Sequence, residues 1–162
     1  MKKYELTDET IEYMGATLHR IWALRDFGDV AAGEPGGFIE SEKNLDHDGT
    51  ARVSGTARVS DNATVYGTAT VYGNATVSGT ARVNKSEHYF TIAPIGSRND
   101  CVTFFHTKER RIGVVCGCFE GGIDAFVAQV EEVHRDNNHE KAYRLAIELA
   151  KMRLEMDEQG EE

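Results

Sequence analysis

Residues 49–84 read GTARVS, GTARVS, DNATVY, GTATVY, GNATVS and GTARVN, six hexapeptides in an unbroken row. Each has alanine in its third place and valine in its fifth, and each begins with glycine or, once, with aspartate. Side chains of a strand alternate between its two faces, so alanine and valine are expected to point inward together. A hexapeptide cannot bury its apolar face alone. The strict period therefore predicts a solenoid, in which each coil stacks on the next.

Three hexapeptides are expected to close one coil of 18 residues, because the glycine or aspartate that begins each repeat tolerates the backbone of a corner. The six repeats then form two coils, and residues 33–48 add most of another. Ile39 and Leu45 precede Ala51 by multiples of six, so they are expected to share the inward phase of the alanines.

The residues before the repeats are expected to be an N-terminal segment, over residues 1–32. Within it, residues 17–27 alternate apolar and polar side chains as a strand does. Residues 33–37, with three glycines and a proline, are interpreted as a turn cluster.

The six-residue period ends at Lys85, and a different pattern follows. Strands are predicted over residues 88–95, 101–107 and 111–119, and the last two are joined by a charged turn at residues 108–110. These strands are expected to form a three-stranded sheet.

Two helices are predicted after this sheet. The first begins near Ile123 and has one apolar face, and a polar break at residues 135–138 separates it from the second. The chain is thus expected to be mainly β with a small α+β extension, divided into a repeat domain (residues 1–84) and an α+β domain (residues 85–162). The apolar face of the second helix is expected to consist of Ala142, Leu145, Ala146, Leu149 and Met152.

The composition narrows the classes of function. The chain has 27 acidic and 18 basic residues, a net charge of −9, and both of its ends are acidic. A nucleic-acid-binding surface needs clustered basic residues, so direct binding of nucleic acid is not expected. No apolar run reaches the roughly 18 residues of a membrane span, and the N-terminus lacks the apolar stretch of a signal peptide. We therefore expect a cytoplasmic protein with no membrane partner, whose three cysteines stay reduced.

The hexapeptides resemble the repeats of the hexapeptide family, which folds as a left-handed parallel β-helix. The left hand is implied by this resemblance, because the general crossover rule favours a right-handed connection. Members of this fold usually assemble as trimers, so the resemblance also implies a homotrimer.

A closer resemblance is to phage and prophage proteins of this architecture. It is carried by RDFGDV at residues 25–30, by GGFIESEKNL at residues 36–45 and by the repeats that follow. The C-terminal region resembles an extension of some such phage proteins, through PIGSR at residues 94–98 and CGCF at residues 116–119. This resemblance implies an accessory protein that acts in the cytoplasm of a bacterial host.

Two enzyme classes use the β-helix fold, the acyltransferases and the γ-type carbonic anhydrases. The zinc site of the second class needs three ligands, and residues 49–84 contain no histidine. For acyl transfer, the one candidate general base near the coils is His47. Because it lies between Asp46 and Asp48, it is better interpreted as an exposed turn residue. The sequence therefore predicts no catalytic residue and no enzyme.

Cys116 and Cys118 suggest a metal site that His106, His134 or His139 would complete. One intervening residue is not the spacing of common zinc knuckles. Two residues apart on a strand, both cysteines are expected to point to the same face as small buried apolar side chains. The sequence therefore predicts no metal and no cofactor.

The loop at residues 96–100 is the best candidate for a small ligand, because Arg98 and backbone amides can hold a phosphate or a carboxylate. The alternative is a polar connection between strands. The acidic helices are expected to carry a protein-binding surface. Tyr66 and Tyr72, on the outside of the repeats, are the candidate oligomer interface. The candidate partner- or ligand-binding residues are Ser97, Arg98, Asn99, Glu131, Glu132 and Asp136.

The favoured hypothesis is a non-enzymatic phage or prophage accessory protein. In it, a trimeric β-helix scaffold carries a module that binds and inhibits a host protein, such as a component of a defence system. Three alternatives stay open. They are a sponge for a small nucleotide, a degenerate hexapeptide acyltransferase, and a structural protein of the virion.

Overall fold

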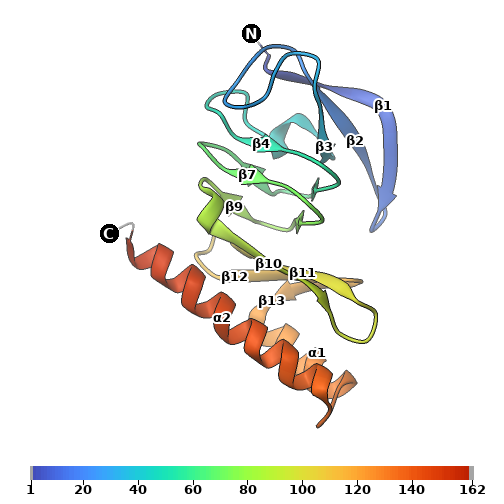
Figure 1. Ribbon diagram of the computed structural model, residues 1–162, viewed down its shortest axis with the longest axis vertical. Helices are drawn as coiled ribbons and strands as arrows, with labels where there is room; N and C mark the ends of the chain where they lie inside the picture. The colour runs from blue at the N-terminus through green and yellow to red at the C-terminus, as the bar shows by residue number, and fades with distance from the viewer. Residues whose placement is uncertain (1, 161–162) are drawn as a thin grey trace. The chain divides into compact units, whose positions relative to one another are not determined.

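The computed structural model describes the backbone of residues 2–160 and the side chains up to Glu155. The chain divides into two compact units, Met1–Ser86 and Glu87–Glu162 (Figure 1). It is mainly β, with several sheets and two helices at its C-terminal end. Over the described residues, no helix has the length and apolar character needed to cross a membrane. Two short 3-10 helices are η1 (Glu42–Asn44) and η2 (Ser86–His88).

The first unit begins with a hairpin of β1 (Tyr4–Tyr13) and β2 (Ala16–Ala23), and β2 pairs in turn with β3 (Pro35–Ile39), again antiparallel. Met14 and Gly15 make the hairpin turn with φ of +51° and +81°, a backbone that matches the twist of paired strands. The strand predicted at residues 17–27 therefore ends early, at Ala23, and β3 begins inside the predicted turn cluster. The apolar pattern does not predict β1, because most of its residues are polar.

The repeats form short parallel ladders, each strand two residues long. β4 pairs with β7, β5 with β8 and β6 with β9, and each partner lies 18 residues further along the chain. The three pairs belong to three different sheets. The spacing predicted from three hexapeptides is thus confirmed. The strands are β4 (Arg52–Val53), β5 (Arg58–Val59), β6 (Thr64–Val65), β7 (Thr70–Val71), β8 (Thr76–Val77) and β9 (Arg82–Val83).

Alanines and valines fill the interior of this unit, and none of the twelve in the repeats is more than 2 % exposed. Backbone hydrogen bonds join successive turns of the chain, for example from Arg52 N to Ala69 O (2.9 Å). The glycines at the corners adopt positive φ, such as +66° at Gly67 and +67° at Gly73. A Cβ on Gly67 would collide with Asn84, whereas one on Gly73 would meet nothing within 4 Å. The corners therefore differ in how much room they leave for a side chain.

Ile39 and Leu45 are buried in the same interior, but not in the phase predicted. They lie beside Val59 and Val65 rather than in an alanine position, and the offset is 20 residues in place of 18. The regular spacing begins at Val53. The two additional residues therefore lie between Leu45 and Val53, and the predicted alanine phase is wrong by those two residues.

The second unit is built on a four-stranded antiparallel sheet, and the prediction of three strands is wrong. The strand predicted over residues 111–119 is divided by a turn at Gly117 and Cys118. Gly117 has a φ of +57°, and glycine in the first central position is typical of a two-residue type II′ turn. The strands, in spatial order, are β10 (Tyr89–Ile95), β11 (Asp100–His106), β12 (Ile112–Cys116) and β13 (Phe119–Gly122).

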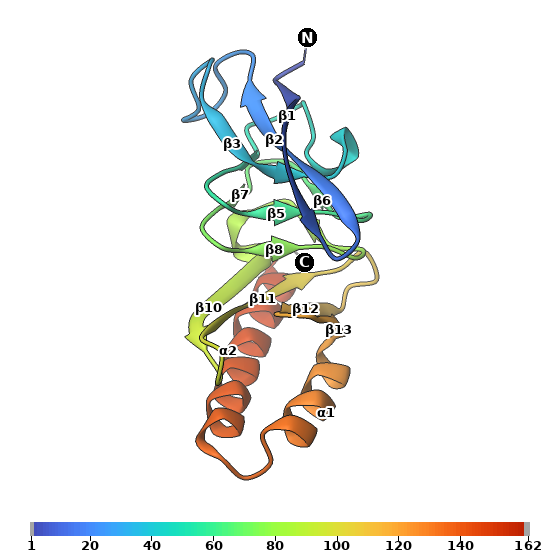
Figure 2. The ribbon, with the colours of Figure 1, turned by 90° about the vertical axis from the view of Figure 1, so that its right-hand side faces the viewer.

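Two helices, α1 (Ile123–Val133) and α2 (Asn138–Gly160), pack on one face of this sheet (Figure 2). The core between the layers is aromatic. Phe126 of α1 meets Phe104 of β11 and Tyr143 of α2 edge-on, with ring centroids 6.2 Å and 5.6 Å apart. The quadrupoles of aromatic rings favour this arrangement over face-to-face stacking.

The predicted apolar face of α2 is largely wrong. The buried face turns Tyr143 toward Phe126, and this rotates the helix so that Leu145, Leu149 and Met152 are 67 %, 44 % and 61 % exposed. At 3.6 residues per turn, these three side chains lie on roughly the opposite side of the helix from the core. The side chains of α2 that are buried are Tyr143, Ala146, Ile147, Ala150 and Leu154.

Candidate functional site

A hollow of about 270 Å³ opens on the second unit, where three segments meet. They are the loop between β10 and β11, the turn between β12 and β13, and a helical wall of α1 and Tyr143. A few polar groups converging on an apolar surface are typical of small-molecule sites. We call this hollow the C-terminal pocket. Its polar lining includes Ser97, Arg98, Asp100, Gln129, His134 and Tyr143, and its apolar lining includes Phe119, Phe126 and Val130.

The register of the sheet brings the first two segments together. Val102 pairs with Cys116 in the hairpin of β11 and β12, so the residues before β11 lie next to the residues after β12. A Cβ on Gly117 would lie 3.2 Å from Oδ2 of Asp100. The Asp100 carboxylate therefore reaches the turn that begins β13, and glycine leaves room for it.

Tyr143 fixes the third segment. Its ring stacks on His134 at a centroid distance of 5.6 Å, and Gly96 packs directly against it, since a Cβ there would collide with the tyrosine hydroxyl. Gly96 also has a φ of +79°. Glycine is thus required at this position both by the backbone and by the close approach of Tyr143.

Two acidic protons in the pocket are held in place by burial. Cys116 Sγ lies 3.7 Å from the Tyr143 hydroxyl. Burial raises the pKa of the Cys116 thiol, although the contact with Tyr143 works in the opposite direction, and burial raises the pKa of Tyr143 as well. Both groups are therefore neutral at pH 7. A reactive cysteine needs a lowered pKa, so Cys116 lacks the environment of a nucleophile.

The charges at the mouth of the pocket are of both signs. Ser97 and Arg98 are exposed, and Asp100 is half-buried. A guanidinium group binds phosphate or carboxylate through charge-assisted hydrogen bonds, and a carboxylate accepts hydrogen bonds from hydroxyl or amino groups. This arrangement suits a small ligand that carries an anionic group at one end and hydrogen-bond donors at the other.

The structure brings together only two of the six predicted binding residues. Ser97 and Arg98 line the pocket, and Asn99, with a φ of +54°, belongs to the same loop but is not part of the lining. Glu131 instead accepts a hydrogen bond from Arg144 at 2.6 Å.

The other two acidic candidates also lie outside the pocket lining. Glu132 is exposed on α1. Asp136, with a φ of +59°, shapes the connection between α1 and α2, where its backbone N–H donates to Glu140.

The two tyrosines predicted as an oligomer interface lie on different sheets. Tyr66 follows β6 and is half-buried, whereas Tyr72 follows β7 and is 61 % exposed. They therefore do not form one continuous patch within a single copy of the chain.

The pocket residues that sequence reasoning missed are Asp100, Gln129, His134 and Tyr143. The predicted turn at residues 108–110 holds a signal for the first of them. A hairpin centred on Glu109 places Asp100 across from Cys118, as the observed pairing of Val102 with Cys116 does. No comparable signal in the sequence places Gln129, His134 or Tyr143, since they depend on how the helices pack.

The two cysteines of the CGC stretch do not share a face, and that prediction is wrong. Cys116 ends β12 and is buried, whereas Cys118 lies in the turn and is exposed. The structure, over the residues it describes, shows no group of three side chains from His, Cys, Asp and Glu placed to hold a metal ion. His106, a candidate ligand in the sequence, contacts the backbone oxygen of Leu154 at 2.9 Å.

His47 is not an exposed turn residue, so that interpretation is also wrong. Its ring stacks on Tyr4 with centroids 4.2 Å apart, and its Nδ1 accepts a hydrogen bond from the backbone N–H of Lys3 at 3.1 Å. Nε2 lies 3.3 Å from Glu42. These contacts give His47 a structural role, since it joins the N-terminus to the first turn of the repeats.

Lys3 itself is fully buried beside His47. Its ammonium group donates to the backbone oxygen of Ala51 at 2.8 Å and lies 4.6 Å from the centre of the Phe27 ring. Burial lowers the pKa of Lys3 to about 8, and the nearby carboxylate of Asp46 opposes that shift. An ammonium group in such a place is stabilised only by these two contacts and by nearby acids.

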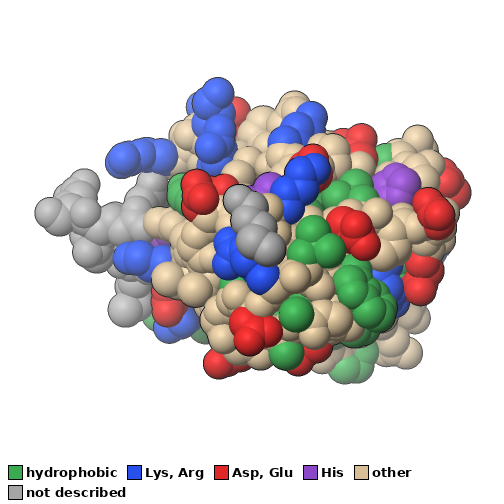
Figure 3. All heavy atoms as spheres, turned by 90° about the horizontal axis from the view of Figure 1, so that it is seen from above, with side chains coloured by type: hydrophobic (Ala, Val, Ile, Leu, Met, Phe, Trp, Pro, Cys, Tyr) green, Lys and Arg blue, Asp and Glu red, His purple; other side chains and the backbone are tan. Residues whose placement is uncertain are grey.

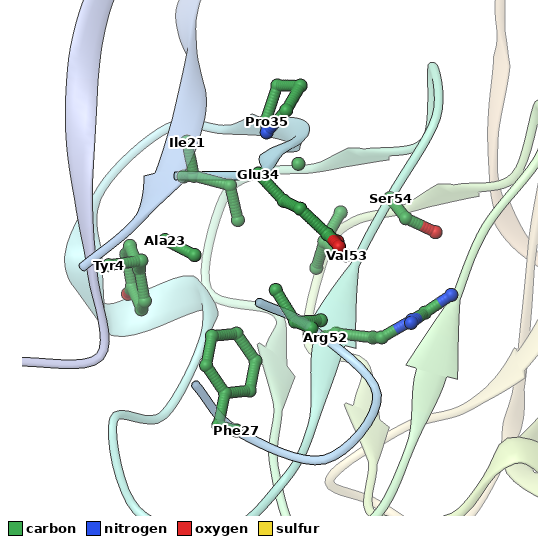
Figure 4. A pocket seen from close by; sticks show the side chains of 11 residues that line it. Tyr4, Ile21, Ala23, Phe27, Glu34, Pro35, Arg52, Val53 and Ser54 are labelled. Carbon is green, nitrogen blue, oxygen red and sulfur yellow. The ribbon is translucent and has the colours of Figure 1, made fainter. Parts of the chain in front are cut away.

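A second, smaller hollow lies in the first unit (Figure 4). It measures about 60 Å³, the volume of roughly two water molecules, and Ile21, Phe27 and Val53 make it largely apolar. Arg52 lies at its edge, and the Nε of Arg52 is buried without a hydrogen-bond partner. The hollow is too small for an organic ligand, so the C-terminal pocket is the better candidate site.

Charges on the surface are mixed. Figure 3 shows one face of the molecule, on which acidic side chains lie next to basic ones. No protein-family model matches this chain, and no curated protein sequence matches it either. Function is therefore inferred from the pocket and the surfaces of the two units.

Proposed function

We propose that this protein is a non-enzymatic binding protein whose C-terminal pocket captures a small anionic ligand of nucleotide-like chemistry. The observation that carries the proposal is the meeting of Arg98, Ser97 and Asp100 around a hollow of about 270 Å³. Arg98 would bind a phosphate, and Asp100 would accept hydrogen bonds from the hydroxyl or amino groups of the same ligand.

The repeat unit would serve as a scaffold. We propose that its three parallel ladders are the faces of a short left-handed β-helix. The ladders support this proposal through their 18-residue spacing, and the hand rests on the resemblance to the hexapeptide family. A scaffold role agrees with the small volume of the hollow in this unit, about 60 Å³.

The state of the pocket side chains favours binding over catalysis. An activated cysteine would be a thiolate, but burial raises the pKa of Cys116. His134 is occupied by stacking on Tyr143. Of the two binding functions considered from the sequence, the pocket supports the capture of a small nucleotide more than the inhibition of a host protein. In a phage protein, such capture would remove a signal molecule of the host.

The test is a calorimetric titration of the full chain with a panel of nucleoside monophosphates, cyclic nucleotides, inorganic phosphate and amino acids. We expect a nucleotide to bind, and R98A to weaken its binding by about tenfold or more, the usual cost of a lost charge-assisted contact.

The matched control is R135A, which removes an exposed arginine outside the pocket lining. It should bind as the unaltered protein does. If no member of the panel binds, or if R98A and R135A bind equally well, the proposed function is wrong.

A further inference from the structure

The outer side of α2 carries a second apolar stripe. Leu145, Leu149 and Met152 follow one another at intervals of four and three residues, and all three are exposed. A surface helix of a globular protein normally has one apolar face, directed at its own core. α2 already buries such a face, through Tyr143, Ala146, Ile147, Ala150 and Leu154, so the second stripe has no function within the unit.

The spacing of the stripe is that of a coiled-coil seam. In the seven-residue pattern labelled a to g, Leu145 and Met152 take position d and Leu149 takes position a. Apolar side chains at a and d let helices of two chains pack side by side with knobs in holes. The stripe therefore fits another helix with the same spacing.

The charges beside the stripe identify that helix. Glu148 takes position g and Arg153 takes position e, and both are exposed. In a parallel pair of helices, position g of one chain lies next to position e of the following heptad in the other chain. Glu148 of each copy would then face Arg153 of the other, which gives two attractive contacts by symmetry. An antiparallel pair would instead bring the two Glu148 side chains together.

We infer that α2 pairs in parallel with α2 of a second copy of this chain, through Leu145, Leu149 and Met152 and through reciprocal contacts between Glu148 and Arg153. The interface is self-complementary, as the symmetry of a homo-oligomer requires. It is independent of the C-terminal pocket, because none of these five residues belongs to the pocket lining.

The first experiment measures the mass of the full chain by analytical ultracentrifugation over a range of concentrations. We expect the unaltered protein to associate and L145Q/L149Q to be monomeric, because the substitution removes the apolar seam. Both residues are exposed, so the fold should persist. L24Q, which alters an exposed leucine of the first unit, is the control and should associate normally.

The second experiment exchanges the charges. E148R and R153E should each weaken association by at least about tenfold, because each places like charges together at two contacts. The double variant E148R/R153E restores opposite charges and should associate within about threefold of the unaltered protein. If the double variant is no better than the single ones, the parallel contact is wrong.

The third experiment distinguishes the direction of the helices. L145C in a C118S background should form a disulfide-linked dimer on mild oxidation, because equivalent d positions of parallel helices come within reach of a disulfide. An antiparallel pair would not bring the two positions together. Absence of the cross-link in a protein that still associates overturns the parallel arrangement. A monomeric unaltered protein overturns the whole inference, and the stripe would then belong to a different partner.

Discussion

The two units bury their apolar surface in different ways. In the repeats, the interior consists of alanine and valine, and the same contacts recur with the strand 18 residues further on. In the second unit, Phe104, Phe126 and Tyr143 come from three different elements, and each occurs once. A repeated core of small side chains distributes stability along the chain, whereas the aromatic core concentrates it in a few residues.

The same difference separates scaffold from pocket. Identical turns of chain stack closely and leave a hollow of only about 60 Å³ beside the N-terminal hairpin. The hollow of about 270 Å³ lies where a loop, a turn and a helix of unrelated sequence meet. Irregular junctions of this kind leave concave surfaces that a regular stack does not.

The strongest way to break the repeated core is to place a charge inside it. V71D buries a carboxylate at a position with no exposed surface, and it should lower the free energy of unfolding by about 4 kcal/mol or more. Urea denaturation followed by circular dichroism measures this loss. T68D, which places the same charge on the exposed side of a neighbouring position, should change the stability by no more than about 0.5 kcal/mol. Equal losses in the two variants would mean that the alternation of inner and outer side chains is wrong.

The aromatic core should depend on single residues. F126A removes a ring that contacts Phe104, Phe119 and Tyr143, and it should cost about 3–5 kcal/mol in denaturant unfolding. F126L keeps much of the volume and should cost less than half as much. A loss below about 1 kcal/mol for F126A would contradict the view that this unit concentrates its stability in a few rings.

The corners of the repeats offer a matched pair of substitutions. G67A and G73A both place a side chain where φ is close to +66°, which costs about 1–2 kcal/mol for any residue other than glycine. Only the Cβ of G67A would also meet Asn84. We therefore expect G67A to be the more destabilising by about 1 kcal/mol or more, as judged by denaturant midpoints at equal slope. Equal midpoints would show that Asn84 moves away without cost.

The smallest expected effect is a dependence on pH at the N-terminus. Lys3 has a pKa of about 8 in the folded protein and 10.5 as its ordinary value, so the unfolded chain binds more protons between these two pH values. The contribution of Lys3 to stability should therefore rise with pH, by about 1 kcal/mol from pH 7 to pH 9.

The measurement is the difference in unfolding free energy between the unaltered protein and K3M at each pH. K3M has no group that titrates there, so the difference between the two proteins should change over this range. A constant difference would mean that the Lys3 ammonium group is not buried when the protein folds.

The repeats were predictable because one local rule applies to every residue in them. The alternation of Ala and Val with outward residues identifies the inner side chains, and six-residue periods identify partners three repeats apart. The rule fails between Leu45 and Val53, where two additional residues shift the phase. It also fails for β1, whose polar sequence pairs with β2 through backbone hydrogen bonds rather than through a buried face.

The second unit was less predictable because its geometry depends on long-range packing. Gly117 turns one apolar stretch into two strands, and the pattern of apolar residues gives no sign of it. On α2, two apolar stripes compete for the core, and the choice is made by Tyr143, which fits against Phe126 and Gly96. The same choice places Tyr143 and His134 in the pocket. The sequence therefore identified the loop with Ser97 and Arg98 but not the wall that faces it.

The parallel pairing of the repeats has a consequence for how such a gene can change. Recombination between near-identical repeats, such as the two adjacent GTARVS sequences, adds or deletes whole hexapeptides. A change of three hexapeptides keeps every later strand on its own sheet, because pairing recurs every 18 residues. A change of one or two would move every later strand to a different sheet. Selection for folded protein should therefore favour lineages that differ in length by three repeats at a time, while the coding sequence of the pocket stays untouched.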